Sequence, residues 1–136
     1  MARYGAWLGF SVVLLLVAGA TRAQEDDGVH YPRSWLNVDI KPIVNNERLF
    51  RKYKECLLAD KTNGCPRDVV EFKRILPEVL ENTCSKCLPE HITKVKEALE
   101  YICQKRPADY DEVRNHRDPT GELQAKFAEK YGKINC

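Results

Sequence analysis

The sequence has almost no net charge, and after its first 17 residues it has no apolar run long enough to cross a membrane. Lys and Arg number 22 against 20 Asp and Glu, and two of the basic residues, Arg3 and Arg22, lie in the first 23 residues. The rest of the chain is therefore formally neutral, with its charges interspersed. Such a surface offers no basic stripe that could follow a phosphate backbone. We therefore expect neither nucleic acid as a partner nor stable insertion into a membrane.

The sequence also lacks the motifs of common active sites. It contains no glycine-rich phosphate-binding loop and no N-x-S/T glycosylation sequon. His30 and His116 stand near no recognisable motif of a serine or cysteine nucleophile. The acidic residues are scattered at the spacing of helix surfaces, as with Glu90 four residues before Lys94. We therefore expect a protein that is not an enzyme and that holds no cofactor.

A third absence concerns β-structure, because no segment of useful length alternates apolar and polar residues. Apolar residues instead recur at intervals of three and four, which is the period of a helix. The clearest such stripe consists of Leu88, Ile92, Val95, Leu99 and Ile102. A long helix with one apolar stripe needs other elements to cover it. The sequence therefore predicts an all-α fold.

Proline and glycine mark the expected ends of the helices. The long helix should run from Pro89 to Arg106, because proline suits the first turn and restricts the residue before it. Another helix should begin at Pro66 and kink or restart at Pro77. Further helices are expected over residues 47–58 and 107–115, and a last one carries Leu123, Phe127 and Tyr131. The total is about six helices, several of them short.

The N-terminus has the pattern of a secretory signal peptide. Arg3 precedes an apolar run from Trp7 to Val17, and Thr21-Arg22-Ala23 fits a cleavage site, with cleavage after Ala20 as the alternative. We therefore divide the chain into a signal peptide (1–23), a polar, flexible arm (24–34) and a helical domain (35–136). The expected location is extracellular.

All six cysteines lie after the signal peptide: Cys56, Cys65, Cys84, Cys87, Cys103 and Cys136. An even count in a secreted chain favours disulfide bonds, but six cysteines allow 15 pairings and the sequence alone does not choose among them. Cys84-x-x-Cys87 at the start of a helix is typical of a thiol redox site, yet no strand precedes it as redox folds require. A local structural disulfide is the better interpretation.

A zinc site is the other interpretation of the cysteines. Cys56, Cys65, Cys84 and Cys87 could supply four thiolates, and His91 lies one helical turn after Cys87. Oxidised cysteines cannot bind zinc, so the extracellular location argues against this site. We therefore expect His91 to be a solvated residue on the surface of its helix, and we expect no metal.

The cysteine spacing and four other motifs together carry a family resemblance. The spacing is C-x8-C-x18-C-x2-C. The other motifs are Asn37-Val38-Asp39-Ile40 with the segment 43–49, Tyr53-x-x-Cys56-Leu57-Leu58, Leu76-Pro77-Glu78-Val79-Leu80 and Asp118-Pro119-Thr120-Gly121. Across residues 37–131 the chain resembles the insect chemosensory proteins, also called the OS-D or pheromone-binding A10 family.

The resemblance implies six helices around a narrow hydrophobic channel and disulfide bonds between Cys56 and Cys65 and between Cys84 and Cys87. It also implies reversible carriage of fatty acids, esters, long-chain alcohols and odorant or pheromone-like molecules. A secreted helical signalling or interaction protein, in development or tissue physiology and without a transport role, is the alternative.

The candidate channel residues are aromatic or branched side chains on the apolar faces. They are Ile43, Val44, Tyr53, Phe72, Leu76, Val79 and Leu99, with Trp35 at the entrance. Tyr53 would offer its hydroxyl to the headgroup of an ester or a carboxylate.

Some positions depart from the family pattern. A tryptophan is usual where Tyr110 stands, and a tyrosine usually occupies the position of Arg117. Cys103 and Cys136 lie outside the pattern; they could pair with each other, Cys136 could bridge two chains, or both could be free thiols. We favour the bond within the chain, and hence a monomer.

Overall fold

The structure of this protein is a computed structural model that describes residues 26–136, so the expected signal peptide lies outside the described residues. A short 3₁₀ helix and six α-helices make up this part of the chain, in which no strand occurs, and the predicted all-α fold is confirmed. The elements are η1 (Arg33–Asn37), α1 (Lys41–Val44), α2 (Glu47–Leu58), α3 (Arg67–Asn82), α4 (Pro89–Lys105), α5 (Pro107–Arg117) and α6 (Glu122–Tyr131).

The helices begin and end where local chemistry demands it. The side chain of Asn46 accepts a hydrogen bond from the N–H of Leu49 (3.0 Å), which caps the start of α2. Pro89 and Pro107 occupy the first positions of α4 and α5, where the missing N–H is not needed. Arg106 leaves the helical region (φ −135°, ψ 61°) and so separates the two helices.

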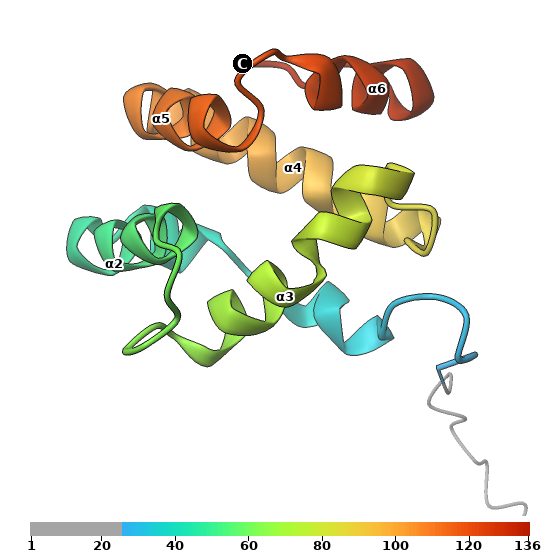
Figure 1. The fold of residues 1–136 in the computed structure, drawn as a ribbon, viewed down its shortest axis with the longest axis horizontal. Helices are drawn as coiled ribbons and strands as arrows, with labels where there is room; N and C mark the ends of the chain where they lie inside the picture. Colours follow the sequence, from blue (N-terminus) through green and yellow to red (C-terminus); the bar gives the residue numbers. More distant parts are fainter. Residues whose placement is uncertain (1–25) are drawn as a thin grey trace, which may run out of the picture.

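Helix α3 runs through Pro77 as one helix, so the alternative of a restart there was wrong (Figure 1). It ends at Thr83, which is left-handed (φ 52°, ψ 48°), and Cys84 is left-handed too (φ 55°). Left-handed residues at a helix end reverse the chain, and they are uncommon for side chains other than glycine. The hydroxyl of Tyr131 supports this reversal, because it donates to the carbonyls of Thr83 (2.6 Å) and Cys84 (3.2 Å).

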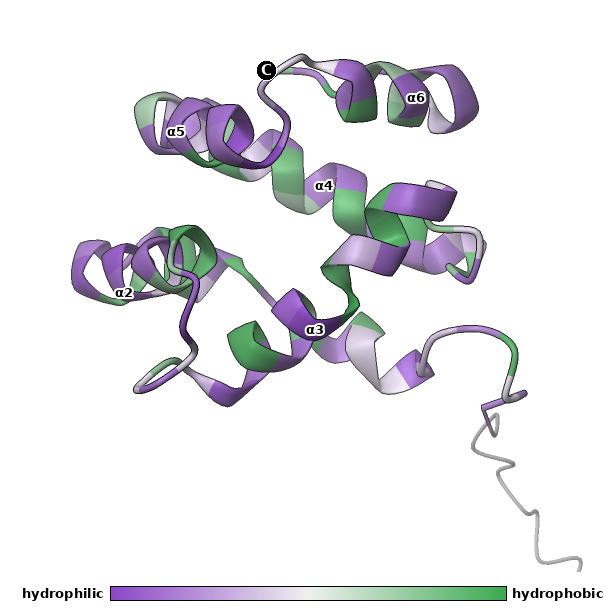
Figure 2. Cartoon of the chain, viewed as in Figure 1, coloured by the Kyte–Doolittle hydropathy of each residue, from purple (hydrophilic) through white to green (hydrophobic). Residues whose placement is uncertain are grey.

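Four helices, α1, α2, α5 and α4, contact one another in a closed ring, and they do not form parallel layers. Helix α2 contacts α1, α3 and α5, while α4 contacts η1, α1 and α5. Figure 1 shows α3 crossing in front of α4, and α6 at one edge, beside the C-terminus. Figure 2 shows hydrophobic stretches of α3 and α4 near the middle of the molecule, with hydrophilic stretches on the outer helices. The elements thus surround a common apolar interior.

Polar side chains tie these helices together at the margins of the interior. Lys54 on α2 lies 2.8 Å from Asp109 and 2.9 Å from Glu112 on α5, and these two hydrogen bonds, first that to Asp109, raise the pKa of Lys54. Arg106 donates to the carbonyl of Val44 (3.0 Å) and lies over the ring of Phe50 (5.0 Å).

Two residues near the end of α5 explain the local sequence there. Arg117, which stands where the family pattern has a tyrosine, donates to the carbonyl of Leu57 at the end of α2. Asp118 is buried (7% exposed) and accepts hydrogen bonds from the N–H groups of Leu123 (3.2 Å) and Gln124 (3.0 Å). These bonds satisfy two free amides in the first turn of α6. The Asp-Pro-x-Gly turn is therefore the start of the last helix.

Three disulfide bonds join the six cysteines: Cys56–Cys65, Cys84–Cys87 and Cys103–Cys136. The first two are the pairs that the resemblance implies. The third is the bond within the chain, and it joins the last turn of α4 to the tail after α6, with 5.5 Å between the two Cα atoms.

The structure differs from the expectation of a flexible arm at the end of segment 24–34. The N–H of Tyr31 donates to the carbonyl of Lys86 (2.9 Å), and the ring of Tyr31 stacks on Trp35 with 5.0 Å between centroids. The charge pattern of residues 25–27 suggested a solvated segment, but the backbone of Tyr31 joins its end to the Cys84–Cys87 loop and the ring of Tyr31 packs on η1.

Replacing both Cys103 and Cys136 with Ser should destabilise the protein more than removing either local bridge. The Cys103–Cys136 bond spans 33 residues of sequence and Cys84–Cys87 only 3. In the loop-closure model the long bridge contributes about 3–4 kcal/mol and the short one about 2 kcal/mol. Urea unfolding of the double variant and of Cys84→Ser/Cys87→Ser would measure both losses. A larger loss for the short bridge would contradict this ranking.

Candidate ligand-binding interior

The apolar faces of the helices are only partly withdrawn from solvent. Among residues 26–136, seven hydrophobic residues are buried: Val44, Phe50, Cys56, Val69, Cys84, Cys103 and Ile134. Three of these are disulfide cysteines, and α3 contributes only Val69. The other apolar side chains along the same faces, such as Ile75, Leu80 and Ile102, are half-buried. A close-packed core would cover them, so these apolar side chains keep part of their surface in contact with solvent.

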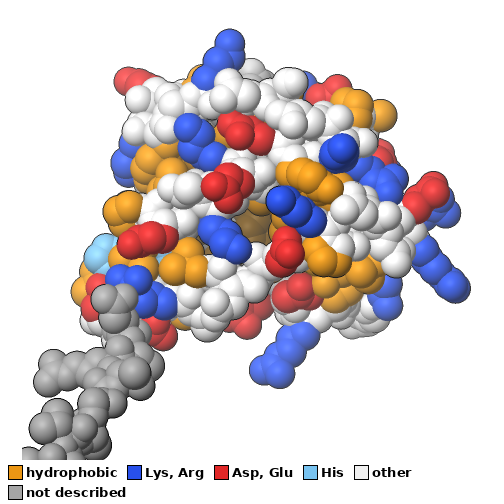
Figure 3. Space-filling model, turned by 180° about the vertical axis from the view of Figure 1, so that it is seen from behind, with side chains coloured by type: hydrophobic (Ala, Val, Ile, Leu, Met, Phe, Trp, Pro, Cys, Tyr) orange, Lys and Arg blue, Asp and Glu red, His pale blue; other side chains and the backbone are white. Residues whose placement is uncertain are grey.

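The surface shows where this interior opens. Figure 3 shows the face opposite to that of Figure 1, with a hollow near its centre whose floor is hydrophobic. Lysine or arginine and acidic side chains stand around the hollow in this view. An apolar floor within a charged rim can admit an apolar molecule while the outer surface stays hydrated.

The candidate channel residues lie on the elements that surround this interior. Ile43 on α1, Leu76 and Val79 on α3, and Leu99 on α4 are all half-buried. Helix α1 contacts both α2 and α4, and α2 contacts α3, so the four helices that carry most of the candidates adjoin one another.

Two candidates lie at the extremes of exposure. Val44 is 2% exposed, so its side chain is packed on all sides. Phe72 is 46% exposed and lies on the outside of α3. Val44 and Phe72 therefore differ from the other candidates, which are half-buried.

Trp35, a residue of η1, belongs to a small aromatic cluster with Tyr31 and His91. Its ring lies edge-on to His91, with 6.5 Å between centroids. His91 is 6% exposed; its Nδ1 accepts from the N–H of Leu88 (3.0 Å), and its Nε2 lies 3.0 Å from the carbonyl of Pro32. These partners assign the neutral ring with its proton on Nε2. The cluster thus fixes η1 on the start of α4.

The expectation of a solvated His91 was wrong. The residue follows Leu88 by three positions and so lies on the apolar side of α4, which is the sequence signal that could have placed it inside. Both ring nitrogens are engaged, and the sulfur atoms of the supposed zinc site are bonded in pairs. Within the part of the chain that the structure describes, no group of three or more His, Cys, Asp or Glu side chains is placed to hold a metal ion.

Tyr53 is half-buried, and its hydroxyl already has a partner. It donates to Oδ2 of Asp68 at the start of α3 (2.8 Å), a contact across 15 residues of sequence. Burial, together with this bond and the charge of Asp68, raises the pKa of Tyr53 to about 12. The hydroxyl has one proton, and it is engaged, so only its oxygen lone pairs remain for a ligand.

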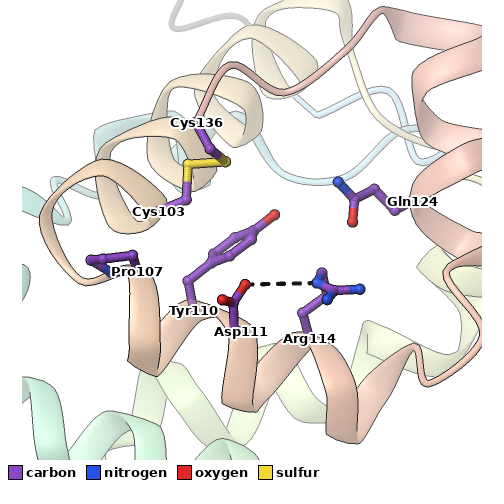
Figure 4. Close-up of a pocket in the computed structure, with 7 residues that line it drawn as sticks. All are labelled: Cys103, Pro107, Tyr110, Asp111, Arg114, Gln124 and Cys136. Carbon is purple, nitrogen blue, oxygen red and sulfur yellow. Dashed lines mark ion pairs between the residues drawn. A yellow bond between two sulfur atoms is a disulfide. The ribbon is translucent and has the colours of Figure 1, made fainter.

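A separate pocket, of about 430 Å³, lies outside this interior, and no pattern in the sequence indicated it. Its walls come from the end of α4, from α5, from α6 and from the tail (Figure 4). A smaller pocket of about 270 Å³ lies beside the Cys56–Cys65 bridge. None of the candidate channel residues lines either pocket.

Within residues 26–136, no helix combines the length and the apolar character that a bilayer crossing requires.

The sequence matches the insect pheromone-binding family, A10/OS-D, over residues 31–125. The chain belongs to this family. It is a family of carriers that bind small ligands and is not an enzyme family. The match spans every described helix up to the first residues of α6.

Two relatives and one solved structure are similar to this A10/OS-D protein over most of its length. It is 30% identical to "Putative odorant-binding protein A10" of Drosophila melanogaster over 105 residues, which cover 77% of this chain and 66% of that protein, slightly less than two thirds of its length. It is 29% identical to allergen Tha p 1 of Thaumetopoea pityocampa, over 90% of this chain and 96% of the relative. The NMR solution structure of CSPsg4 is 27% identical, with a TM-score of 0.50, over 82% of this chain and all of that one.

The Tyr53–Asp68 bond gives a titration that can be measured. Because the folded pKa is raised from 10.0 to about 12, the neutral phenol contributes stability that is present below pH 10 and is lost as the pH rises toward 12. The ¹³Cζ shift of Tyr53 should therefore titrate near pH 12, and Asp68→Asn should lower that midpoint because it removes the anion. Glu71→Gln, on the next turn of α3, should leave it unchanged. A Tyr53 midpoint near 10 in the unsubstituted protein would contradict the bond.

Proposed function

We propose that this A10/OS-D protein is a secreted carrier that reversibly binds small hydrophobic ligands in the apolar interior between α1, α2, α3 and α4. Fatty acids, esters, long-chain alcohols and odorant or pheromone-like molecules form the ligand class. One observation carries this proposal: apolar side chains along α3 and α4, among them Leu76, Val79 and Leu99, stay partly exposed to solvent. A ligand would cover these side chains, and no chemistry would be required of the protein.

The binding energy would come from removing an alkyl chain from water. Each buried CH₂ contributes about 0.8 kcal/mol, so a chain of 12–16 carbons contributes roughly 10 kcal/mol before costs. Immobilising the ligand and ordering the lining side chains remove much of this, so dissociation constants of about micromolar are expected. An affinity in this range allows release as well as uptake.

Leu76, Val79, Leu99 and Ile43 are the proposed lining, with Trp35 at the entrance. We place Val44 behind the lining, since it is already packed on all sides, and Phe72 at the outer rim. The Tyr53 oxygen keeps a free lone pair, which favours ligands that donate a hydrogen bond. Alcohols therefore fit this position better than the esters and carboxylates expected from the sequence.

Chain length tests the carrier proposal directly. A fluorescent apolar probe bound to the protein should be displaced by linear alcohols of 8–16 carbons, with a dissociation constant that falls by up to about fourfold per CH₂ until the interior is full. The measurement is a set of competition curves at one probe concentration. Affinity that does not rise with chain length would refute binding in an apolar interior.

A filling substitution tests where the ligand lies. Leu99→Trp on α4 should occupy the interior and weaken probe binding by about tenfold or more, because a larger side chain takes the space of the ligand. Glu97→Trp, two positions earlier on the same helix at an exposed position off the apolar stripe, is the matched control and should bind the probe normally. Circular dichroism of both variants shows that each is folded. Equal affinity of the two folded variants would place the ligand elsewhere.

A further inference from the structure

The pocket between α5 and α6 combines hydrogen-bond donors with an apolar wall. Its lining residues are Cys103, Pro107, Tyr110, Asp111, Arg114, Gln124 and Cys136, and its volume is about 430 Å³. Figure 4 shows the hydroxyl of Tyr110, the guanidinium of Arg114 and the carboxamide of Gln124 reaching the same space from two helices. This volume is typical of sites for small organic molecules.

The polar groups of this pocket have unused hydrogen-bonding capacity. Within the described residues, the one recorded partner of the Arg114 guanidinium is Asp111, and the pair is long, at 4.0 Å. The carboxylate of Asp111 is 63% exposed, so water screens this pair. The side chains of Tyr110 and Gln124 make no hydrogen bond in the same part of the chain. Arginine can only donate hydrogen bonds, so the pocket favours a ligand with a hydrogen-bond acceptor.

The charges around the pocket select the type of acceptor. A carboxylate can take two parallel hydrogen bonds from one guanidinium and would displace the weakly held Asp111. Asp111 remains nearby, and its negative charge disfavours a ligand with two charges, such as a phosphate monoester. A monoanion therefore fits best.

The remaining walls are apolar and rigidly held. Pro107, the ring of Tyr110 and the Cys103–Cys136 bridge offer carbon and sulfur surface for the body of a ligand. The tail that carries Cys136 is fixed on α4, because Gln104 donates to the carbonyl of Asn135 (2.8 Å) and the N–H of Asn135 donates to Glu100 (3.1 Å). A wall fixed in advance lowers the ordering cost of binding.

We propose that the α5–α6 pocket is a second binding site, which takes small monocarboxylates with an aromatic or short aliphatic body. Arg114 binds the carboxylate, Tyr110 and Gln124 donate to it, and Pro107 with the disulfide bridge covers the apolar body. The site is separate from the interior, because it shares no residue with the proposed lining. Both ligands can therefore be bound at once.

Calorimetric titration with 3-phenylpropionate and with its neutral amide, 3-phenylpropanamide, tests the charge requirement. The carboxylate should bind with about tenfold higher affinity than the amide, since hydrogen bonds to a charged group are the stronger ones. Chemical-shift changes in the ¹⁵N-labelled protein should include the side chains of Arg114 and Gln124. No binding, or equal affinity for the two compounds, would overturn the proposal.

Arg114→Gln should remove the preference for the carboxylate. Arg74→Gln is the matched control, because Arg74 forms the same i,i+3 pair with Glu71 (3.4 Å) on the outside of α3, and it should bind as the unsubstituted protein does. Gln124→Glu is a second variant, in which a like charge should repel the ligand. Unchanged binding in both pocket variants would overturn the assignment.

The interior must be distinguished from this pocket, since phenylpropionate has an apolar body. Saturating the protein with the fluorescent apolar probe should leave phenylpropionate affinity unchanged, and Leu99→Trp should leave it unchanged too. Displacement of one ligand by the other would mean that phenylpropionate enters the interior, and it would overturn the second site. If the unsubstituted protein bound phenylpropionate but failed to bind the apolar probe, only the carrier function proposed above would be refuted.

Discussion

The structure depends on the joining of short helices at their ends, because their apolar faces are only partly withdrawn from solvent. Half-buried apolar side chains contribute less stability than close-packed ones, so packing alone is a weak constraint here. Covalent bonds and polar contacts at the helix ends supply the rest. Cys103–Cys136 joins the end of α4 to the tail, and the Lys54 pairs join α2 to α5. These links hold the helices together although their apolar faces stay partly exposed.

The buried polar residues serve the same purpose. His91 and Asp118 are the two buried polar or charged side chains of the described chain, and each satisfies backbone groups at the start of a helix. Neither faces the interior as an unpaired group, which would be costly. The hydroxyl of Tyr53 is likewise paired, because it donates to Asp68. This pairing suits a protein that holds apolar molecules by desolvation.

The helix ends could be predicted from the sequence, because they depend on the chemistry of nearby residues. Proline at the first turn marked α4 and α5, and the Asp118-Pro119-Thr120-Gly121 turn is present, with Gly121 N–H donating to Asp118 (3.1 Å) and Gly121 left-handed at φ 77°. These features depend on residues within four positions of one another. The apolar stripe of α4 likewise belongs to a single helix.

The site was harder to predict, because its main contacts join residues that are far apart in the sequence. Nothing near Tyr53 in the sequence shows that Asp68 takes its proton, and nothing near His91 shows that Pro32 lies against its ring. One wall of the α5–α6 pocket is formed by the Cys103–Cys136 bridge, whose two cysteines are 33 residues apart in the sequence. Periodicity assigns a residue to a face, but it does not say which side chain from another helix meets it.

The order of the cysteines along the chain has a consequence for biosynthesis. Two bridges span 9 and 3 residues, so each can close soon after its second thiol leaves the ribosome. Cys103 must wait for the whole of α5 and α6 to be made, since its partner is residue 136. The third bridge, and with it this wall of the pocket, can therefore form only once residue 136 has been made.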